Sequence, residues 1–414
     1  MSLLADLLST VFERATKPLA QQADSGAPLD EMMRDLVRNH DEVQGMVLAQ
    51  QILNRYHAME DAEKKAFFLM LAQDMDIQPD QVRAALDAYE ADQTKATYRA
   101  FVEAAEAPRQ EMLRRLNQVP GATGQLVAMR ADLLKLVRDH PELAPVDLDF
   151  RHLFASWFNR GFLVLRPVNW DSPAQILEKI IAYEAVHAID SWDDLRARLL
   201  PSDRRCFAFF HPSMPNEPLI FVEVALTRGV PSSIHSVLTE DRTELPPQEA
   251  DTAVFYSISN CQAGLASISF GNSLIKQVAG DLARDLPGLK TFVTLSPIPG
   301  LAAWMESVDK NELNPDADID EVAADFLLNA KRLDGMPIDP VARFHLGNGA
   351  MVHAVHAKAD LSAKGQAQSK GAMVNYLYDL SKIAENVQAF TTGGQVVASS
   401  AVKAQARNAT RIKR

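Results

Sequence analysis

Two residues of this sequence, Ser296 and His345, have side chains that could take part in chemistry. Ser296 follows a predicted strand over residues 291–295 and precedes two prolines, which fix the backbone and leave the hydroxyl at the strand's end. His345 lies in the segment FHLGNG. In such places a serine more often caps a turn, and a lone histidine is more often a buried, hydrogen-bonded residue. The serine would provide a hydroxyl group, and the histidine would provide an acid or base whose usual pKa is near neutral.

The other histidines have no spacing typical of a metal site. His353 and His356 lie close to His345 in the sequence, but residues three apart on a strand point to opposite faces. His211 and His235 have no ligand spacing either. We therefore expect no metal.

The stretch that must position Ser296 runs from residue 252 to residue 300. It predicts a buried strand over 252–259, a loop rich in Gly, Ala and Ser, a helix with an apolar stripe, and the strand over 291–295. Such a unit is a right-handed parallel crossover. Its loop is a candidate pyrophosphate cradle, because small residues let an anion approach a helix N-terminus. Packing alone explains the small residues equally well, since neither Walker A nor G-x-G-x-x-G is present.

Several segments resemble the malonyl-CoA decarboxylase family. The central ones are FYSISNCQAGLASISFGNSLIKQV, LSPIPG, PVARFHLGNGA and MVNYLYDL, and upstream lie FNRGFLVLRPVNWDSPAQILEKIIAYEAVH and RRCFAFFHPSMPNEPLIFVEVALT. The resemblance covers residues 150–380 strongly and the helical N-terminal part more weakly. LSPIPG together with FHLGNGA is its most specific part.

The resemblance implies an α+β fold with a GNAT-like acetyltransferase-fold catalytic domain that contains a mixed sheet. In that fold two adjacent parallel strands, here 252–259 and 291–295, splay apart and hold the thioester arm between them. Helical periodicity predicts an all-helical packing or assembly domain over residues 1–150, and the resemblance implies that it is an oligomerisation domain. The catalytic domain is expected over 151–392, and 393–414 as a basic, poorly ordered tail.

Capping patterns predict several helix starts. Ser172 is expected to cap a helix with Pro173 at its first position, and Ser191 caps the next helix. After a proline-containing break over 141–147, Asp147 is expected to cap another helix. Residues 371–379 are compatible with helix or strand.

The resemblance also assigns site residues. Ser296 corresponds to the family's catalytic serine and His345 to its proton donor. Substrate-binding residues are expected at Ser257, Asn375 and Tyr376. The expected cradle consists of Ala266, Ser267, Ile268, Ser269, Phe270, Gly271 and Asn272. The family's animal members carry a glutamate where this chain has Ser269, so no carboxylate role transfers to that position.

The implied reaction is decarboxylation of malonyl-CoA to acetyl-CoA and CO₂ through an enolate. His345 would donate a proton to the α-carbon, and Ser296 would orient the carboxylate or accept a proton. Backbone N–H groups near the loop would hold the thioester oxygen. No cofactor is expected, because the thioester is itself an electron sink and coenzyme A is part of the substrate.

Two other functions remain open at this point. An acyl-CoA-dependent acyltransferase would need an acceptor amine or hydroxyl and would release no CO₂ from the thioester alone. A non-catalytic sensor that binds coenzyme-A thioesters would keep its output when His345 is replaced.

Composition limits the partners and the location. The chain has 414 residues, for which two domains are the default, and its net charge of −12 argues against nucleic acid and anionic membranes as partners. Two cysteines, Cys206 and Cys261, indicate a reducing compartment. No apolar run reaches the about 18 residues of a membrane span. The N-terminal residues carry acids, unlike a transit peptide, so we expect a cytoplasmic protein. The resemblance implies a homo-oligomer, expected to be a homotetramer.

Overall fold

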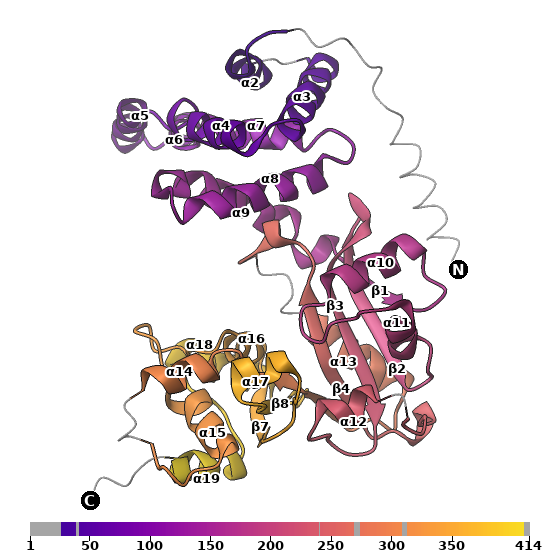
Figure 1. Ribbon diagram of the computed structural model, residues 1–414. Coiled ribbons are helices and arrows are strands. Elements are labelled where there is room, and N and C mark those ends of the chain that lie inside the picture. The colour runs from indigo at the N-terminus through magenta and orange to yellow at the C-terminus, as the bar shows by residue number, and fades with distance from the viewer. Residues whose placement is uncertain (1–25, 39–40, 240, 269–273, 309–312, 410–414) are drawn as a thin grey trace, which may run out of the picture. The chain divides into compact units, whose positions relative to one another are not determined.

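The computed structural model describes residues 26–38, 41–239, 241–268, 274–308 and 313–409 (Figure 1). The chain divides into two compact units. A helical unit is formed by Met1–Phe162, His211–Pro215 and Gln262–Ser269, and a sheet unit by Leu163–Phe210, Asn216–Cys261 and Phe270–Arg414. No helix of the described residues is long and apolar enough to cross a membrane.

The described part of the main segment of the helical unit contains helices and no strand, as predicted. Its helices are α2 (Leu29–Arg38), α3 (Glu42–His57), α4 (Asp61–Gln73), α5 (Pro79–Ala91), α6 (Lys95–Ala105), α7 (Pro108–Leu116), α8 (Ala122–Val137) and α9 (Ala144–Trp157), with 3₁₀ turns η1 (Pro141–Leu143) and η2 (Arg160–Phe162). A further 3₁₀ turn, η4 (Ala263–Leu265), lies in the segment Gln262–Ser269 of the same unit. The expectation that Asp147 caps a helix is wrong. Helix α9 begins at Ala144, because Pro145 fits the first turn, where its missing N–H has no partner to lose.

Arg130 holds the segment Gln262–Ser269 within the helical unit. The side chain is 1% exposed, and its Nη1 donates to the carbonyl oxygens of Gly264 at 2.6 Å and Ala266 at 3.0 Å. Its Nε pairs with Asp147 at 2.8 Å. A Cβ on Gly264 would lie 1.8 Å from the carbonyl oxygen of Val127 in α8. Close packing against α8 therefore requires glycine at this position of the loop.

The sheet unit contains eight strands in the order β1-β2-β3-β4-β5-β8-β6, with β7 beside β8 (Figure 1). The strands are β1 (Val164–Val168), β2 (Arg204–His211), β3 (Met214–Thr227), β4 (Thr252–Asn260), β5 (Thr291–Thr294), β6 (Ser296–Pro297), β7 (Met351–His356) and β8 (Met373–Leu377). The helices are α10 (Ala174–Tyr183), α11 (Trp192–Leu199), α12 (Ile234–Leu238), α13 (Leu274–Asp285), α14 (Leu301–Ser307), α15 (Ile319–Asn329), α16 (Pro340–Gly347), α17 (Ala363–Ser369), α18 (Ile383–Gly393) and α19 (Ser400–Ala409), with the 3₁₀ turn η3 (Pro247–Glu249).

Strands β4 and β5 run parallel and then part. Their pairing begins at Thr252 and Thr291 and ends at Phe255 and Thr294. Strand β4 pairs with β3 along its whole length, whereas β6, beyond β5, pairs with β8. Tyr256 is left over in the pairing of β3 with β4, so it is the extra residue of a β-bulge, which bends a strand. The predicted helical N-terminal region and the mixed-sheet domain in which two parallel strands part are confirmed.

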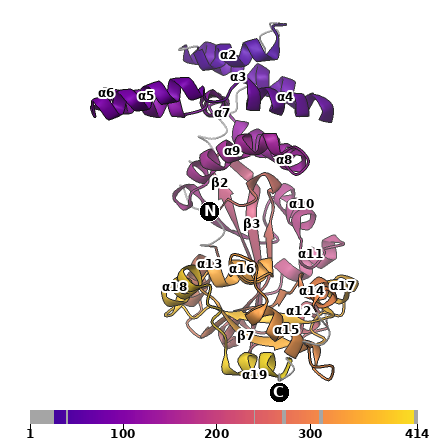
Figure 2. The same cartoon turned by 90° about the vertical axis from the view of Figure 1, so that its left-hand side faces the viewer.

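Helices cover both faces of the sheet unit, as the two views show (Figures 1 and 2). Met373 of β8 packs in one apolar cluster with Ile234 of α12. Tyr376 of the same strand stacks on His345 of α16. Residues an odd number apart on a strand point to opposite faces, so α12 and α16 cover opposite faces of the sheet at β8.

Other sequence expectations need correction in the sheet unit. Ser172 does not cap α10: that helix begins at Ala174 with Pro173 as its cap, and the Ser172 hydroxyl oxygen accepts the backbone N–H of Asn169 at 3.1 Å. Ser191 does cap α11. The ambiguous residues 371–379 contain strand β8.

The expected poorly ordered tail is wrong for residues 400–409, which form α19 and pack on α15 and β7. Val402, Ala406 and Ala409 are buried along one side of α19. This spacing is that of a helical stripe, which the small, polar and basic composition of the tail conceals.

Candidate functional site

Ser296 and His345 meet within the sheet unit although 49 positions separate them. His345 Nε2 lies 3.2 Å from Ser296 Oγ, and the two residues are 2% and 5% exposed. Ser296 lies in β6, where it pairs with Val374 of β8. His345 lies in the last turn of α16, a helix that the sequence analysis did not predict. Asp339 caps it by accepting the backbone N–H of Ala342 at 2.7 Å.

A chain of hydrogen bonds extends from this pair in both directions. The Tyr378 hydroxyl lies 2.8 Å from His345 Nδ1. Ser296 Oγ donates to Thr294 Oγ1 at 2.8 Å, and Thr294 Oγ1 also accepts the backbone N–H of Tyr376 at 3.2 Å. The Tyr376 ring stacks on the imidazole, with centroids 4.5 Å apart. Strands β5 and β8 therefore fix the position and the plane of the catalytic candidates.

Burial determines the protonation states of these groups in the free protein. It lowers the pKa of His345 to about 3, because the imidazolium loses its hydration there. It raises the pKa of both Tyr376 and Tyr378 well above the usual value. The free protein therefore holds a neutral imidazole between a serine hydroxyl and a protonated tyrosine hydroxyl.

A cavity of about 230 Å³ lies where β4 and β6 have parted. It is lined by Val186, Phe255, Tyr256, Ile258, Asn260, Ser296, Pro297, Pro340, Val341, Phe344 and His345. Within the described part of the chain, the lining residues include no lysine or arginine. A carboxylate in this cavity would therefore be poorly solvated, with Ser296 and His345 as its nearest polar neighbours on the β6 side.

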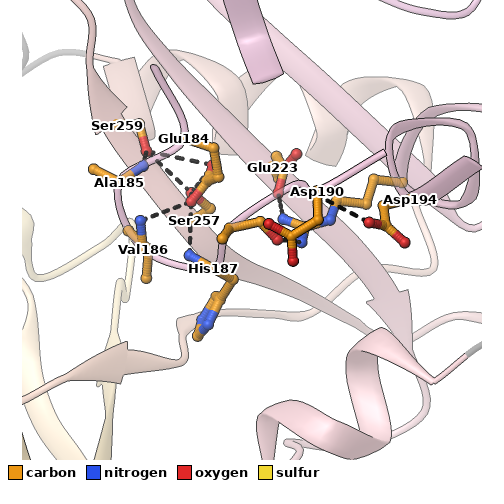
Figure 3. A network of polar contacts seen from close by, with 11 residues as sticks. Glu184, Ala185, Val186, His187, Asp190, Asp194, Glu223, Ser257 and Ser259 are labelled. Atoms are coloured by element: carbon orange, nitrogen blue, oxygen red, sulfur yellow. Dashed lines mark hydrogen bonds and ion pairs between the residues drawn. The ribbon is translucent and has the colours of Figure 1, made fainter. Parts of the chain in front are cut away.

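Glu184 places the wall segment of this cavity, which we define as residues 184–188 (Figure 3). Its Oε1 accepts the backbone N–H groups of Val186 at 2.8 Å and His187 at 2.9 Å. The Ser257 hydroxyl lies 2.8 and 2.7 Å from its two carboxylate oxygens, and Ser259 Oγ accepts the backbone N–H of Ala185 at 3.1 Å. One carboxylate thus ties the wall segment to β4 and holds Val186 against the cavity.

A buried ion pair continues this network. Arg198 Nη1 lies 3.1 Å from Glu223 Oε2, and its Nη2 donates to the carbonyl oxygen of Ala188 at 2.9 Å (Figure 3). Burial, reinforced by the charge of Glu184, raises the pKa of Glu223 to about 7. Through the contact of Arg198 with Ala188, this pair anchors the far end of the wall segment.

The structure brings some of the sequence-predicted site residues together and leaves others apart. Ser296 and His345 meet, and Tyr376 joins them by stacking. Asn375 does not line the cavity, but its Nδ2 donates to the carbonyl oxygen of Thr294 at 2.8 Å. Ser257 faces Glu184 instead of the cavity lining.

The predicted cradle is only partly described. Ala266, Ser267 and Ile268 belong to the segment Gln262–Ser269 of the helical unit. Ser267 adopts a left-handed backbone, with φ of 64°. Ser269, Phe270, Gly271 and Asn272 lie outside the described residues. The roles of the cradle residues and of Ser257 stay predictions.

The sequence analysis missed the groups that support the pair. Thr294 lies two positions before Ser296, which on a strand puts both side chains on one face. Tyr378 has the same relation to Tyr376 in MVNYLYDL. This alternation could have identified both residues. The wall segment gave no such signal, because its contacts join residues 73 positions apart. Among the described residues, no group of three or more His, Cys, Asp or Glu side chains could hold a metal ion.

Comparisons with known proteins show which family the chain resembles. Residues 161–318 and 307–414 match the family model described as malonyl-CoA decarboxylase C-terminal domain, and residues 76–158 match its N-terminal domain. The curated mitochondrial malonyl-CoA decarboxylase of Anser anser anser is 34% identical, over 70% of this chain and 68% of that protein. The one of Rattus norvegicus is 32% identical, over 69% and 68%.

Solved structures match over more of the chain. The malonyl-CoA decarboxylase from Rhodopseudomonas palustris is 46% identical, with a TM-score of 0.85, and covers 92% of this chain and 100% of its own. The one from Agrobacterium vitis is 47% identical, with a TM-score of 0.87, over 91% and 99%. The one from Cupriavidus metallidurans is 35% identical, with a TM-score of 0.73.

Proposed function

The chain belongs to the malonyl-CoA decarboxylase family, and we propose that it converts malonyl-CoA to acetyl-CoA and CO₂ with Ser296 and His345 as its catalytic residues. The observation that carries the assignment of residues is their 3.2 Å contact at the wall of the cavity between β4 and β6. The thioester arm would reach the cavity through the gap where the two strands part.

The reaction breaks the bond between the α-carbon and the carboxylate carbon. The electron pair of this bond moves toward the thioester carbonyl and gives an enolate, while the carboxylate leaves as CO₂. The enolate then takes one proton at the α-carbon and becomes acetyl-CoA. We assign that proton to His345, whose Nε2 faces Ser296 at the cavity wall.

Substrate binding makes His345 a better proton source than it is in the free protein. The free imidazole is neutral, because burial lowers its pKa to about 3. A malonyl carboxylate beside the ring favours the charged form, since an opposite charge within a few ångströms raises the pKa of histidine. The complex therefore takes up a proton, and the imidazolium has that proton to give to the enolate.

The apolar cavity wall favours loss of the carboxylate. Val186, Ile258 and Phe344 offer no hydrogen bond to its negative charge. As the C–C bond breaks, the negative charge moves from the carboxylate into the thioester. The transition state therefore has less charge on the poorly solvated carboxylate than the bound substrate has. The thioester supplies the electron sink, and on this proposal no cofactor takes part.

Ser296 has one of two roles, and the other predicted residues are expected to bind substrate. Its hydroxyl either orients the carboxylate or accepts a proton. Substrate binding by Ser257, Asn375, Tyr376 and the cradle over residues 266–272 stays a prediction, because none of Ser257, Asn375 and Tyr376 lines the cavity. Backbone N–H groups near the cradle would hold the thioester oxygen, where one donor is worth about 3–4 kcal/mol in comparable sites.

The direct test is incubation with malonyl-CoA while acetyl-CoA and CO₂ are followed together. We expect both products in equal amounts. Formation of neither product by folded protein would refute the proposal. A product that appears only when an amine or hydroxyl acceptor is added, without CO₂, would indicate an acyltransferase instead.

We further propose a homotetramer assembled through the helical unit. Tyr98 and Val102 of α6 are 54% and 44% exposed, and neither α5 nor α6 buries any residue, so apolar surface is available there for a second copy. Sedimentation velocity distinguishes monomer from tetramer.

We also propose a cytoplasmic location, supported by Cys206 and Cys261, which are both buried free thiols. The curated relatives are named mitochondrial. Cell fractionation tests the proposal: the protein in the cytoplasmic fraction supports it, and the protein in an organelle fraction refutes it.

A further inference from the structure

Thr294 is a buried residue that hydrogen-bonds to Ser296 and to strand β8. It is 0% exposed and is absent from the cavity lining. Its Oγ1 accepts from Ser296 Oγ at 2.8 Å and from the backbone N–H of Tyr376 at 3.2 Å. Its carbonyl oxygen accepts from Asn375 Nδ2 at 2.8 Å. The Thr294 hydroxyl cannot turn away from Ser296 without leaving a buried N–H of β8 unpaired, which is costly.

These contacts give the hydrogen-bond chain a direction. Ser296 has one hydroxyl proton, and it points to Thr294. Ser296 Oγ therefore meets His345 Nε2 as an acceptor, so the ring proton belongs on Nε2. Nδ1 then has the lone pair and accepts from the Tyr378 hydroxyl at 2.8 Å. A neutral imidazole has one N–H, and in this hydrogen-bond chain that N–H is on Nε2 and donates to Ser296.

We infer that Thr294 is a positioning residue that sets the tautomer of His345 by holding the proton of Ser296. Its value for catalysis rests on the proposed function: an arriving malonyl carboxylate meets an Nε2–H donor instead of a lone pair. Without the Thr294 hydroxyl, the Ser296 proton turns to Nε2. The ring proton then moves to Nδ1, where the Tyr378 oxygen accepts it.

The test is ¹⁵N NMR on ligand-free protein that contains ring-labelled histidine. The signals of His345 are identified by their loss in His345→Gln. We expect the Nε2–H tautomer in the unmodified protein, the Nδ1–H tautomer in Thr294→Val, and the Nε2–H tautomer again in Thr294→Ser. Thr291→Val, the same change at the other end of β5, is the control and keeps the Nε2–H tautomer.

Turnover gives a second readout. Thr294→Val should lower kcat by about tenfold or more with KM changed by less than about threefold, and Thr294→Ser should restore kcat. An Nδ1–H tautomer in the unmodified protein, or an unchanged tautomer in Thr294→Val, overturns the inference. If Thr294→Val does not fold, an Nδ1–H tautomer in the unmodified protein or in Thr294→Ser still overturns the inference. If the unmodified protein releases no CO₂ while the tautomers behave as expected, the proposed function fails and the positioning role of Thr294 stands.

Discussion

The ring of His345 lies against the ring of Tyr376, with planes 24° from parallel and centroids 4.5 Å apart. Tyr376 belongs to β8, and the same strand pairs through Val374 with Ser296 of β6. One strand therefore holds both catalytic candidates, the first by ring stacking and the second by backbone pairing. Their contact rests on a sheet instead of a loop, which suits a pair that must keep a fixed geometry.

Replacing His345 with asparagine should separate binding from turnover. Asn keeps a polar group of similar size but cannot protonate carbon, so we expect turnover to fall about a hundredfold or more while thioester affinity is kept. The measurements are kcat with malonyl-CoA and the Kd of acetyl-CoA. His353→Asn, in β7, is the matched control. Equal turnover in His345→Asn would remove His345 from the mechanism.

Binding of malonyl-CoA should take up a proton, and binding of acetyl-CoA should not. The free imidazole of His345 has a pKa of about 3, and only the malonyl group brings a carboxylate that raises it. Calorimetry of the His345→Asn variant, which binds without rapid turnover, gives the baseline. Calorimetry of Ser296→Ala in buffers of different ionisation enthalpy shows the uptake. An uptake that persists when His345→Asn is combined with Ser296→Ala would come from a group other than His345.

The buried histidine should also make stability depend on pH. The pKa of His345 is about 3 in the folded protein and the usual 6.5 when unfolded, so between these values the unfolded chain binds more protons. The stabilising contribution is present above about pH 6.5 and is lost as pH falls toward about 3, by up to about 1.4 kcal/mol per pH unit. His187, with a pKa lowered to about 4, acts in the same direction.

Urea unfolding at about pH 7 and about pH 4.5 tests this dependence. The free energy of unfolding should fall less between the two conditions in His345→Gln than in the unmodified protein. An identical fall in both proteins would show that His345 is accessible to protons in the native state.

Truncating Glu184 should loosen the cavity wall. Glu184→Ala removes the acceptor of the half-buried Val186 and His187 N–H groups, and a fully buried unpaired group costs about 1–3 kcal/mol, which is the upper limit for each. We expect lower stability together with a higher KM, because Val186 no longer has a fixed place. Glu178→Ala, on the exposed side of α10, the helix that ends just before Glu184, should change neither quantity. A stability loss at unchanged KM would give Glu184 a structural role alone.

Gly264→Ala should destabilise the helical unit. The added Cβ would lie 1.8 Å from the backbone oxygen of Val127, so the loop or α8 must shift, at a cost of about 1–3 kcal/mol or more. Gly45→Ala in α3 meets no atom within 4 Å and should raise stability by about 0.5–1 kcal/mol. Thermal unfolding of both variants checks the contrast. Equal effects would mean that the loop has room for a side chain.

Local patterns explain which parts of the fold the sequence predicted well. The parallel pair β4 and β5 and the cap Ser191 follow from periodicity and from residues adjacent in the chain. Helix α16 was missed because its signals, Asp339 as cap and Pro340 in the first turn, lead into a short glycine-ended segment. Helix α19 was missed because its buried stripe consists of small residues.

By itself the sequence determined the candidates Ser296 and His345, the strands that part beside them, and the family from which their roles come. Only the tertiary structure decided that Thr294 and Tyr378 complete the hydrogen-bond chain and that Glu184 ties Val186 to the cavity. The physical reason is distance along the chain. Periodicity reports which face a residue occupies on its own element, whereas a contact such as that of Ser296 with His345 depends on how separate elements pack.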